Sequence, residues 1–411
     1  MSETTTKLDA DWLSEGPLPR LFAALNRDGD EARVVGGAVR NALLGEPVHD
    51  IDVATTAEPA TVVSRVNAAG FKAVPTGIEH GTVTVVIESR PFEVTSLRED
   101  VETFGRHATV RFGRDWKKDA ERRDFTMNAL SVGADGIVHD HVGGISDLKA
   151  RKVRFIGDAA TRIAEDYLRI LRFFRFHAHY GRGFLDSTGM HACIEGRGGL
   201  DQLSRERVRM ELMKLLVAPH ATPVLATMTE AGILPRVLGG VPFLASFENV
   251  TKAEAAGGLP ADPVQRFAAL GVWLSEDGER LTERLRLSNA EHERLVSMGD
   301  GWWRVTPSDE KAARALLYRL GPQRFADRVL IAWARSREGA ADKAWKNLLS
   351  LPDHWIVPVF PLKSADFVAR GVAKGPALGA AMRAAEDAWV AADFPSDATA
   401  VAAIADAAVK A

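Results

Sequence analysis

The chain has 411 residues, of which 46% are hydrophobic and 26% are charged, a balance typical of a globular protein with two or three domains. Its one cysteine, Cys193, excludes an intramolecular disulfide framework and a thiolate zinc cluster, and fits a reducing compartment. Because no apolar run reaches about 18 residues and the N-terminus has no signal-peptide core, we expect a cytoplasmic protein without a membrane partner.

The net charge of −3 excludes a surface coated with basic residues, but the charge is unevenly distributed. Residues 98–216 contain 22 Lys and Arg against 18 Asp and Glu, so this stretch carries +4 and the remainder −7. A locally basic middle suits a polyanion bound at one place, although a difference this small is also compatible with chance.

The first predicted elements are a strand over residues 32–35 and a helix over residues 38–44, joined by Gly36 and Gly37. Glycines at such a turn let backbone N–H groups approach a phosphate closely, because no Cβ stands in the way. Arg40 in the following helix can bind an anion through two N–H groups. Taken alone, the turn is more often purely structural.

Two carboxylates follow in a second predicted strand, over residues 50–54. Residues i and i+2 of a strand project from one face, so Asp50 and Asp52 point at the same place, with Ile51 and Val53 buried beside them. Like charges so close repel unless a cation lies between them, and Mg²⁺ commonly takes one or two carboxylates plus substrate phosphates. An isolated pair is usually a solvated strand edge, but beside the glycine turn metal binding is the better interpretation.

Residues 81–88 and 92–95 predict a β-hairpin, and with the earlier strands it indicates a small mixed sheet. Glu93 on the second hairpin strand is a candidate third carboxylate near the metal, and a paired surface role is the alternative. Residues 98–119 predict a mobile loop that contains Gly105, Arg106, Arg111, Gly113 and Arg114. After it, Arg122 or Arg123 can face an anion, unless both form surface salt bridges with nearby acids.

Beyond residue 159 the strand signals almost vanish and the apolar spacing becomes helical. One predicted helix contains four charged residues three apart, which drift slowly around one face: Asp166, Arg169, Arg172 and Arg175. A solvated basic stripe is the ordinary interpretation, but the phenylalanines around it make unpartnered arginines costly. A later helix over residues 205–216, with Ser204 as a candidate N-cap, is expected to order the neighbouring domain rather than to act in catalysis.

These motifs together resemble the class II CCA-adding tRNA nucleotidyltransferases and the related bacterial poly(A) polymerases, within the DNA polymerase β superfamily. The resemblance covers roughly residues 30 to 220 and rests on motifs in family order: Gly36-Gly37-Ala38-Val39-Arg40, Asp50-Ile51-Asp52, Thr95 to Asp100, Arg122-Arg123-Asp124, Glu165-Asp166-x-x-Arg169 and the helix after Ser204.

The resemblance implies an α+β fold, with a small mixed-sheet nucleotidyltransferase head followed by all-helical neck and body/tail domains. Gly- and Pro-rich segments at 239–242 and 256–263 indicate the last boundary. We therefore expect an N-terminal extension without an assigned role (1–30), a catalytic head (31–155), a nucleotide-selecting and RNA-binding neck (156–242) and a tRNA-binding body and tail (243–411).

The implied activity is template-independent addition or repair of the 3′-terminal CCA of tRNA from CTP and ATP. By this resemblance Asp50 and Asp52 are the catalytic residues and the ligands of Mg²⁺, the expected cofactor, and the RNA 3′ hydroxyl attacks the nucleotide α-phosphorus in line. The implied nucleotide-binding residues are Gly36, Gly37, Arg40, Arg123, Asp166, Arg169, Arg172 and Arg175.

Base choice is assigned by the resemblance to Asp166 and Arg169, and hydrogen-bond chemistry agrees with it. Cytosine and adenine both offer an amino donor beside a ring-nitrogen acceptor, which fits a carboxylate next to a guanidinium. Uracil and guanine instead present a carbonyl acceptor to the carboxylate and an N–H donor to the guanidinium, so neither pair forms a hydrogen bond. Each buried unsatisfied group costs about 1–3 kcal/mol.

One departure and three alternatives remain at this point. Asn41 stands where the family usually has Asp, so any role as an ion partner of Arg40 is in doubt. A poly(A) polymerase would share the same head and neck. A metal-dependent phosphohydrolase, suggested by His49-Asp50 and His139-Asp140, would need further His and Asp ligands, and a non-catalytic RNA-binding protein has no need for paired carboxylates beside a glycine turn.

Overall fold

The structure is a computed structural model that describes residues 6–78, 81–104, 107–339 and 342–410. The chain divides into two compact units, Met1–Ile233 and Leu234–Ala411. The division falls a few residues before the boundary near residue 242 that the glycine and proline pattern indicates.

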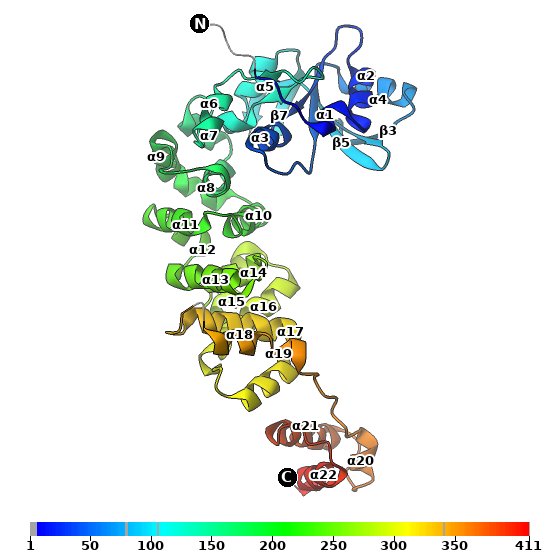
Figure 1. The fold of residues 1–411 in the computed structure, drawn as a ribbon, viewed down its shortest axis with the longest axis vertical. Helices are drawn as coiled ribbons and strands as arrows, with labels where there is room; N and C mark the ends of the chain where they lie inside the picture. Colours follow the sequence, from blue (N-terminus) through cyan, green and yellow to red (C-terminus); the bar gives the residue numbers. More distant parts are fainter. Residues whose placement is uncertain (1–5, 79–80, 105–106, 340–341, 411) are drawn as a thin grey trace. The chain divides into compact units, whose positions relative to one another are not determined.

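The first unit contains a seven-stranded mixed sheet in the order β3-β4-β5-β2-β1-β8-β9 (Figure 1). Strands β2 and β5 run parallel, whereas the other neighbours are antiparallel. The strands are β1 (Ala32–Val35), β2 (Asp52–Thr55), β3 (Lys72–Gly77), β4 (Thr82–Ile87), β5 (Arg90–Ser96), β8 (Ser131–Val132) and β9 (Val138–His139). The predicted hairpin is confirmed as β4–β5, and β1 is buried along its whole length.

Residues 98–119 differ from the predicted loop. They form a separate hairpin of β6 (Arg98–Phe104) and β7 (His107–Phe112), followed by helix α5 (Trp116–Glu121). The prediction of a loop is therefore wrong for most of this segment, although Gly105 and Arg106 lie outside the described residues. A bulge between Asp100 and Glu102 shifts the strand register, which obscures the alternation that would mark a strand in the sequence.

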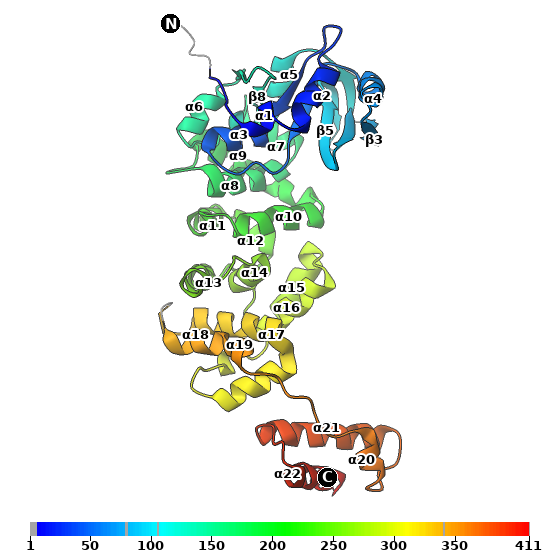
Figure 2. The same ribbon diagram turned by 45° about the vertical axis from the view of Figure 1, so that its right-hand side comes forward.

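The N-terminal segment packs into the head. Helices α1 (Asp11–Ser14) and α2 (Pro17–Leu25) precede the sheet, and α2 packs against β1 and against α4 (Pro59–Ala68) (Figures 1 and 2). Leu21 and Leu25 of α2 are completely buried. Residues 6–25, for which the sequence offers no role, thus contribute apolar side chains to the core around the sheet.

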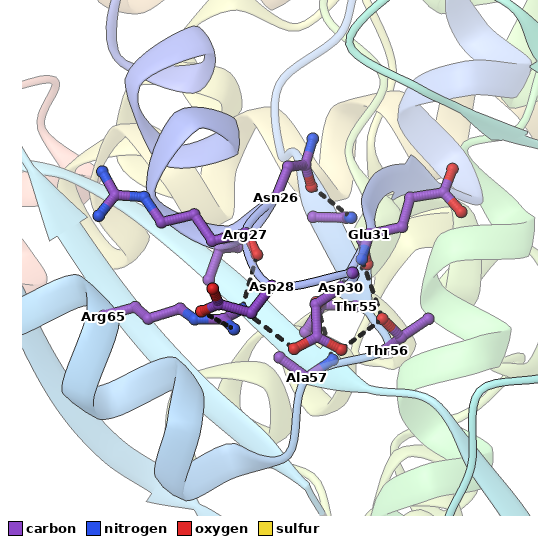
Figure 3. A network of polar contacts seen from close by, with 12 residues as sticks. Asn26, Arg27, Asp28, Asp30, Glu31, Thr55, Thr56, Ala57 and Arg65 are labelled. Carbon is purple, nitrogen blue, oxygen red and sulfur yellow. Dashed lines mark hydrogen bonds and ion pairs between the residues drawn. The ribbon is translucent and has the colours of Figure 1, made fainter.

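A polar network fixes the connection between α2 and β1 (Figure 3). The backbone N–H of Ala32 donates to Asn26 Oδ1 over 2.6 Å, and Thr56 donates to Asp30 over 2.9 Å. Arg65 of α4 lies 3.1 Å from carboxylate oxygens of both Asp28 and Asp30. These contacts tie the N-terminal segment to the end of β2 and to α4.

The helices that complete the first unit are α3 (Gly37–Leu44), α6 (Gly144–Lys149), α7 (Ala159–Glu165), α8 (Leu168–Tyr180), α9 (Ser187–Gly196), α10 (Arg205–Leu216) and α11 (Ala221–Glu230). Phe125 from the head packs against Phe155, and against Phe173 and Phe176 of α8, with ring centroids 5.0 to 6.3 Å apart. This buried aromatic cluster joins α8 to the end of the head.

The described part of the second unit is helical, as the sequence predicts. Its helices are α12 (Ile233–Leu238, which begins at the boundary), α13 (Leu244–Gly257), α14 (Pro263–Gly271), α15 (Ser275–Leu285), α16 (Asn289–Gly299), α17 (Glu310–Arg335), α18 (Lys343–Leu349), α19 (Leu351–His354), α20 (Ser364–Val368), α21 (Pro376–Ala391) and α22 (Ala398–Lys410). Gly321 has a non-helical backbone inside α17, next to Pro322, and kinks it. None of the helices in the described ranges has both the length and the apolar character needed to cross a membrane. The predicted α+β class is confirmed.

Candidate active site

The glycine turn joins β1 to α3. Gly36 has φ 70° and ψ −120°, a conformation that side-chain-bearing residues rarely adopt, and its N–H donates to Leu130 O over 3.0 Å. A Cβ at Gly36 would lie at ordinary contact distance from its neighbours, so backbone conformation rather than space requires glycine here. Gly37 is the first residue of α3, whose first N–H groups have no partner within the helix and can receive an anion.

The carboxylates gather at the start of β2. Asp52 opens this strand and is in register with Glu93 on the parallel strand β5, while Asp50 stands two residues earlier. All three line a cavity of about 450 Å³. The strand predicted over residues 50–54 thus begins two residues later in the structure, at Asp52, and Ile51 is half-buried rather than buried.

The electrostatics of the three acids favour a cation. Burial, the Glu93 carboxylate and the Asp50 carboxylate, in that order, raise the pKa of Asp52 above its ordinary value of 3.8, and Arg123 opposes the rise. A raised pKa means that ionised Asp52 is disfavoured beside the other two acids until a positive charge compensates it.

The donor set fits Mg²⁺ when a nucleotide supplies further ligands. Within the described ranges, no group of three or more His, Cys, Asp or Glu residues is placed to hold a metal ion. Mg²⁺ commonly binds through one or two carboxylates together with substrate phosphates and water, which matches Asp50 and Asp52. Asp140, one of the residues that suggested the phosphohydrolase alternative, accepts backbone N–H groups of Val142, Gly144 and Ile145.

Arg123 lies at the glycine turn. Its Nη1 lies 3.5 Å from the position that a Cβ at Gly36 would occupy. Its Nε and Nη2 donate to Asp119 over 3.2 and 3.0 Å. Arg122 binds the other oxygen of the same buried carboxylate, with its Nε 2.8 Å away. Asp119 thus anchors both arginines and directs Arg123 towards the turn.

Arg40 is buried within the protein. Its guanidinium donates to Asn128 Oδ1 over 2.5 Å, to Tyr180 Oη over 2.6 Å, and twice to Asn41 Oδ1 over 2.9 and 3.1 Å. It also lies 4.0 Å from the centroid of the Tyr180 ring. Asn41 therefore binds Arg40 through hydrogen bonds, but it carries no negative charge and cannot be the ion partner that an aspartate would be.

Asp124 was not among the candidate residues, yet it connects the head to α8. It accepts hydrogen bonds from Arg172 Nε and Nη2 over 2.8 and 2.5 Å, from Asn128 Nδ2 over 3.0 Å, and from the backbone N–H of Phe125. Because Asn128 also binds Arg40, one hydrogen-bonded chain runs from the arginine beside the glycine turn to α8.

Asp166 lies outside α8, contrary to the prediction that it shares one helix with the three arginines. It has an extended backbone, φ −155° and ψ 105°, between α7 and α8, so only Arg169, Arg172 and Arg175 share α8. Its carboxylate is bound by both terminal nitrogens of Arg207, over 2.6 and 3.2 Å. The helix assigned a purely structural role, α10, thus supplies a direct partner of the candidate base-reading acid.

The arginines of α8 have acidic partners. Arg169 binds Glu165 over 2.5 Å, and Arg175 binds the buried Glu211 of α10 over 2.5 Å. Arg172 lies 3.7 Å from Glu211 in addition to its bonds with Asp124. The solvated basic stripe of the ordinary interpretation is therefore not found, because acids from α7, from the head and from α10 pair with the three arginines, as the cost of unpartnered arginines in a well-packed helix requires.

Comparison with known families identifies the class of protein. Residues 32–154 match the family model described as the poly A polymerase head domain, and residues 189–247 match the model described as a probable RNA and SrmB-binding site of polymerase A. Together with the carboxylates beside the glycine turn, these matches define an RNA nucleotidyltransferase.

Similar proteins show to which family of RNA nucleotidyltransferases the chain belongs. The chain is 36% identical over 385 residues to the mitochondrial CCA tRNA nucleotidyltransferase 1 of Mus musculus, covering 90% of this chain and 85% of that protein. It is 32% identical over 390 residues to the CCA-adding enzyme of Limosilactobacillus fermentum, covering 89% and 90%. The crystal structure of the Bacillus stearothermophilus CCA-adding enzyme in complex with CTP superposes with a TM-score of 0.76 at 28% identity, over 94% of this chain and 95% of that one. The chain belongs to the family of CCA-adding tRNA nucleotidyltransferases.

Proposed function

We propose that this protein adds or repairs the 3′-terminal CCA of tRNA, using CTP and ATP without a nucleic-acid template. The observation that carries the proposal is the pair of carboxylates, Asp50 and Asp52, beside a glycine turn that Arg123 faces. Relatives that match about nine tenths of this chain are named for CCA addition. The complex of the Bacillus stearothermophilus enzyme with CTP supports CTP as one substrate.

In the proposed reaction, the 3′ oxygen of the RNA forms a bond to the α-phosphorus of the nucleotide. The bond from that phosphorus to the oxygen bridging to the β-phosphate breaks on the opposite side, pyrophosphate leaves with the bonding electron pair, and the hydroxyl proton passes to solvent water. Asp50 and Asp52 would hold Mg²⁺, which when bound promotes ionisation of the hydroxyl and neutralises charge on the leaving group. Glu93 is close enough to add negative charge to the same place.

The triphosphate is assigned to the glycine turn and to Arg123: Gly37 offers a backbone N–H at the start of α3, whereas Gly36 shapes the turn and donates its own N–H to Leu130 O. Arg40 donates four hydrogen bonds within the protein, so we propose that it holds α3 and Tyr180 in place beside the turn. A direct contact between Arg40 and the triphosphate stays a prediction.

Base choice is assigned to Asp166 and Arg169, with Arg172 and Arg175 holding α8 in position through Asp124 and Glu211. Arg207 binds the Asp166 carboxylate through two nitrogens and so fixes the plane of its oxygens. The carboxylate then presents its remaining lone pairs to an amino group, which cytosine and adenine offer and uracil does not.

The proposed domains are a head at 31–155, a neck at 156–242 and a tRNA-binding body and tail at 243–411. The cytoplasm is the proposed compartment, on the ground of the single cysteine, Cys193, which is buried. Some similar relatives are mitochondrial, so fractionation of cells that express the protein is the test.

The decisive test of the activity is incubation with tRNA that lacks its 3′ CCA, supplied with each nucleoside triphosphate alone and with all four together. We expect CTP alone to add two residues, CTP with ATP to add three, and UTP or GTP to add none. A long ladder with ATP alone would instead establish the poly(A) polymerase alternative. Absence of any incorporation would refute both.

A further inference from the structure

The cavity beside the catalytic carboxylates has a wall from the N-terminal segment. Its lining includes Trp12 of α1 together with Asp50, Asp52 and Glu93. Its volume of about 450 Å³ lies within the range of ordinary small-molecule sites, roughly 300–1,000 Å³. The described residues that line it include neither the glycine turn nor Arg123.

The position of this cavity matters because the transfer is an in-line displacement. The attacking oxygen and the leaving pyrophosphate stand on opposite sides of the α-phosphorus. With the triphosphate on the glycine turn and Arg123, the acceptor oxygen has to reach Asp50 and Asp52 from the other side. The cavity contacts both aspartates, and its described lining includes none of the triphosphate residues, so it is placed for the acceptor.

The segment that carries Trp12 is tied to the head on both sides of this residue. The backbone N–H of Leu8 donates to Gly136 O over 2.8 Å, and the backbone N–H of Val138, in β9, donates to Thr6 O over 2.9 Å. Leu13, next to Trp12, is buried, and α2 packs on the sheet immediately afterwards. The indole itself is only half-buried. A partly exposed Trp side chain has only two χ angles, so it loses little side-chain entropy on binding a second ring.

The chemistry of the cavity suits a nucleotide of a polynucleotide chain. An indole face stacks on any nucleobase, because every base has a π-face. Arg90, exposed at the start of β5, places a guanidinium on the same cavity, and guanidinium groups bind phosphate oxygens well. Val48 and Pro91 add apolar surface.

We propose that this cavity receives the 3′-terminal nucleotide of the acceptor RNA, with its base stacked on Trp12 and its backbone phosphate near Arg90. The inference rests on the proposed function, since it takes the substrate to be an RNA 3′ end. It gives residues 6–14 a role in binding the acceptor, whereas the choice of the incoming base stays with Asp166 and Arg169.

Photocrosslinking locates the terminal base directly. A tRNA that ends in 5-iodocytidine in place of its first 3′-terminal C is bound to the full-length protein without nucleotide and irradiated, and the crosslinked peptide is identified by mass spectrometry. We expect the crosslink in the tryptic peptide that contains Trp12, residues 8–20. A crosslink confined to the neck, or a crosslink at Trp12 from 5-iodo-CTP instead of from the tRNA, would overturn the assignment.

Kinetics provide the second arm. Trp12→Ala should lower kcat/KM for tRNA about 5- to 150-fold, the loss of one base stack, with the KM for CTP unchanged. Trp12→Phe should retain most of the activity because it keeps an aromatic face. Phe71→Ala, which removes a half-buried ring of the head outside the cavity, is the matched control and should change neither constant.

The outcomes separate this inference from the function on which it rests. The role of Trp12 is refuted if the wild type and Trp12→Ala have equal kcat/KM for tRNA and circular dichroism shows that both proteins are folded. CCA addition would still stand in that case. If the wild type adds no nucleotide, CCA addition fails, and the crosslink still decides whether an RNA 3′ end occupies the cavity.

Discussion

Replacing Asp124 with alanine tests the connection between the head and α8. The change removes the acceptor of two hydrogen bonds from Arg172 and of one each from Asn128 and the Phe125 backbone. Breaking a buried ion pair from one side costs about 3–5 kcal/mol. Arg172 keeps 31% of its side-chain exposure and has Glu211 at 3.7 Å, so water and the second acid recover part of the loss. We expect a net cost of about 2–4 kcal/mol.

Hydrogen–deuterium exchange of peptides from α8 measures this cost locally, which matters because a chain with two units need not unfold in one transition. A cost of about 2–4 kcal/mol corresponds to amide exchange roughly 30- to 900-fold faster when exchange follows the opening equilibrium. Asp124→Asn is the matched control, since it keeps an acceptor oxygen and loses only the charge, so its effect should be smaller. Unchanged exchange of α8 in Asp124→Ala would refute the reasoning.

The same experiment has a defined pH dependence. Burial opposes ionisation of Asp124, but Arg172 and the hydrogen bonds from Asn128 and Phe125 outweigh it and hold the pKa below its ordinary value of 3.8. A lowered folded-state pKa gives stability that is complete above 3.8 and is lost as the pH falls through the lower, folded value. The difference between wild type and Asp124→Ala should therefore persist from neutral pH down to about pH 4 and shrink only below it.

Three further predictions concern the site. Asp52→Ala should lower nucleotide incorporation at least about 1,000-fold while circular dichroism and tRNA binding stay unchanged, and near-normal incorporation would remove the metal assignment. The pKa of Asp52 is raised, and its proton has to leave before a cation binds. The affinity for Mn²⁺ in the absence of nucleotide should therefore fall as the pH drops towards the acid range. Electron paramagnetic resonance measures this affinity, and binding that does not depend on pH contradicts the prediction. Arg207→Ala should reduce the preference for CTP over UTP about tenfold, measured as a ratio of kcat/KM, whereas Arg205→Ala on the same helix should leave it unchanged.

The sequence predicts the parts of the site that depend on local pattern. Gly36, Gly37 and Asp52 lie where a strand meets a turn and where the next strand begins, and both strands are marked by β-branched residues. The two-residue strands β8 and β9 are too short to show any alternation, so their place in the sheet comes only from pairing with β1 and with each other.

What the sequence does not reveal are the partners that lie far apart in the chain. Asp124 and Arg172 are 48 residues apart, and Asp166 and Arg207 are 41 apart, so no local period relates them. The spacing of three from Asp166 onward suggests one continuous helix, but the backbone becomes extended at Asp166. Tertiary contacts thus convert a predicted basic stripe into a set of compensated arginines around the candidate base-reading acid.

The central claim is that side chains, rather than a template, choose the base. The most direct measurement is kcat/KM for CTP, ATP, UTP and GTP with tRNA acceptors, in the wild type and in Asp166→Ala. One unsatisfied buried group costs about 1–3 kcal/mol, so the preference for CTP over UTP should fall about 5- to 150-fold in the variant, more than its KM for CTP rises. An unchanged preference for C and A over U and G would contradict the account.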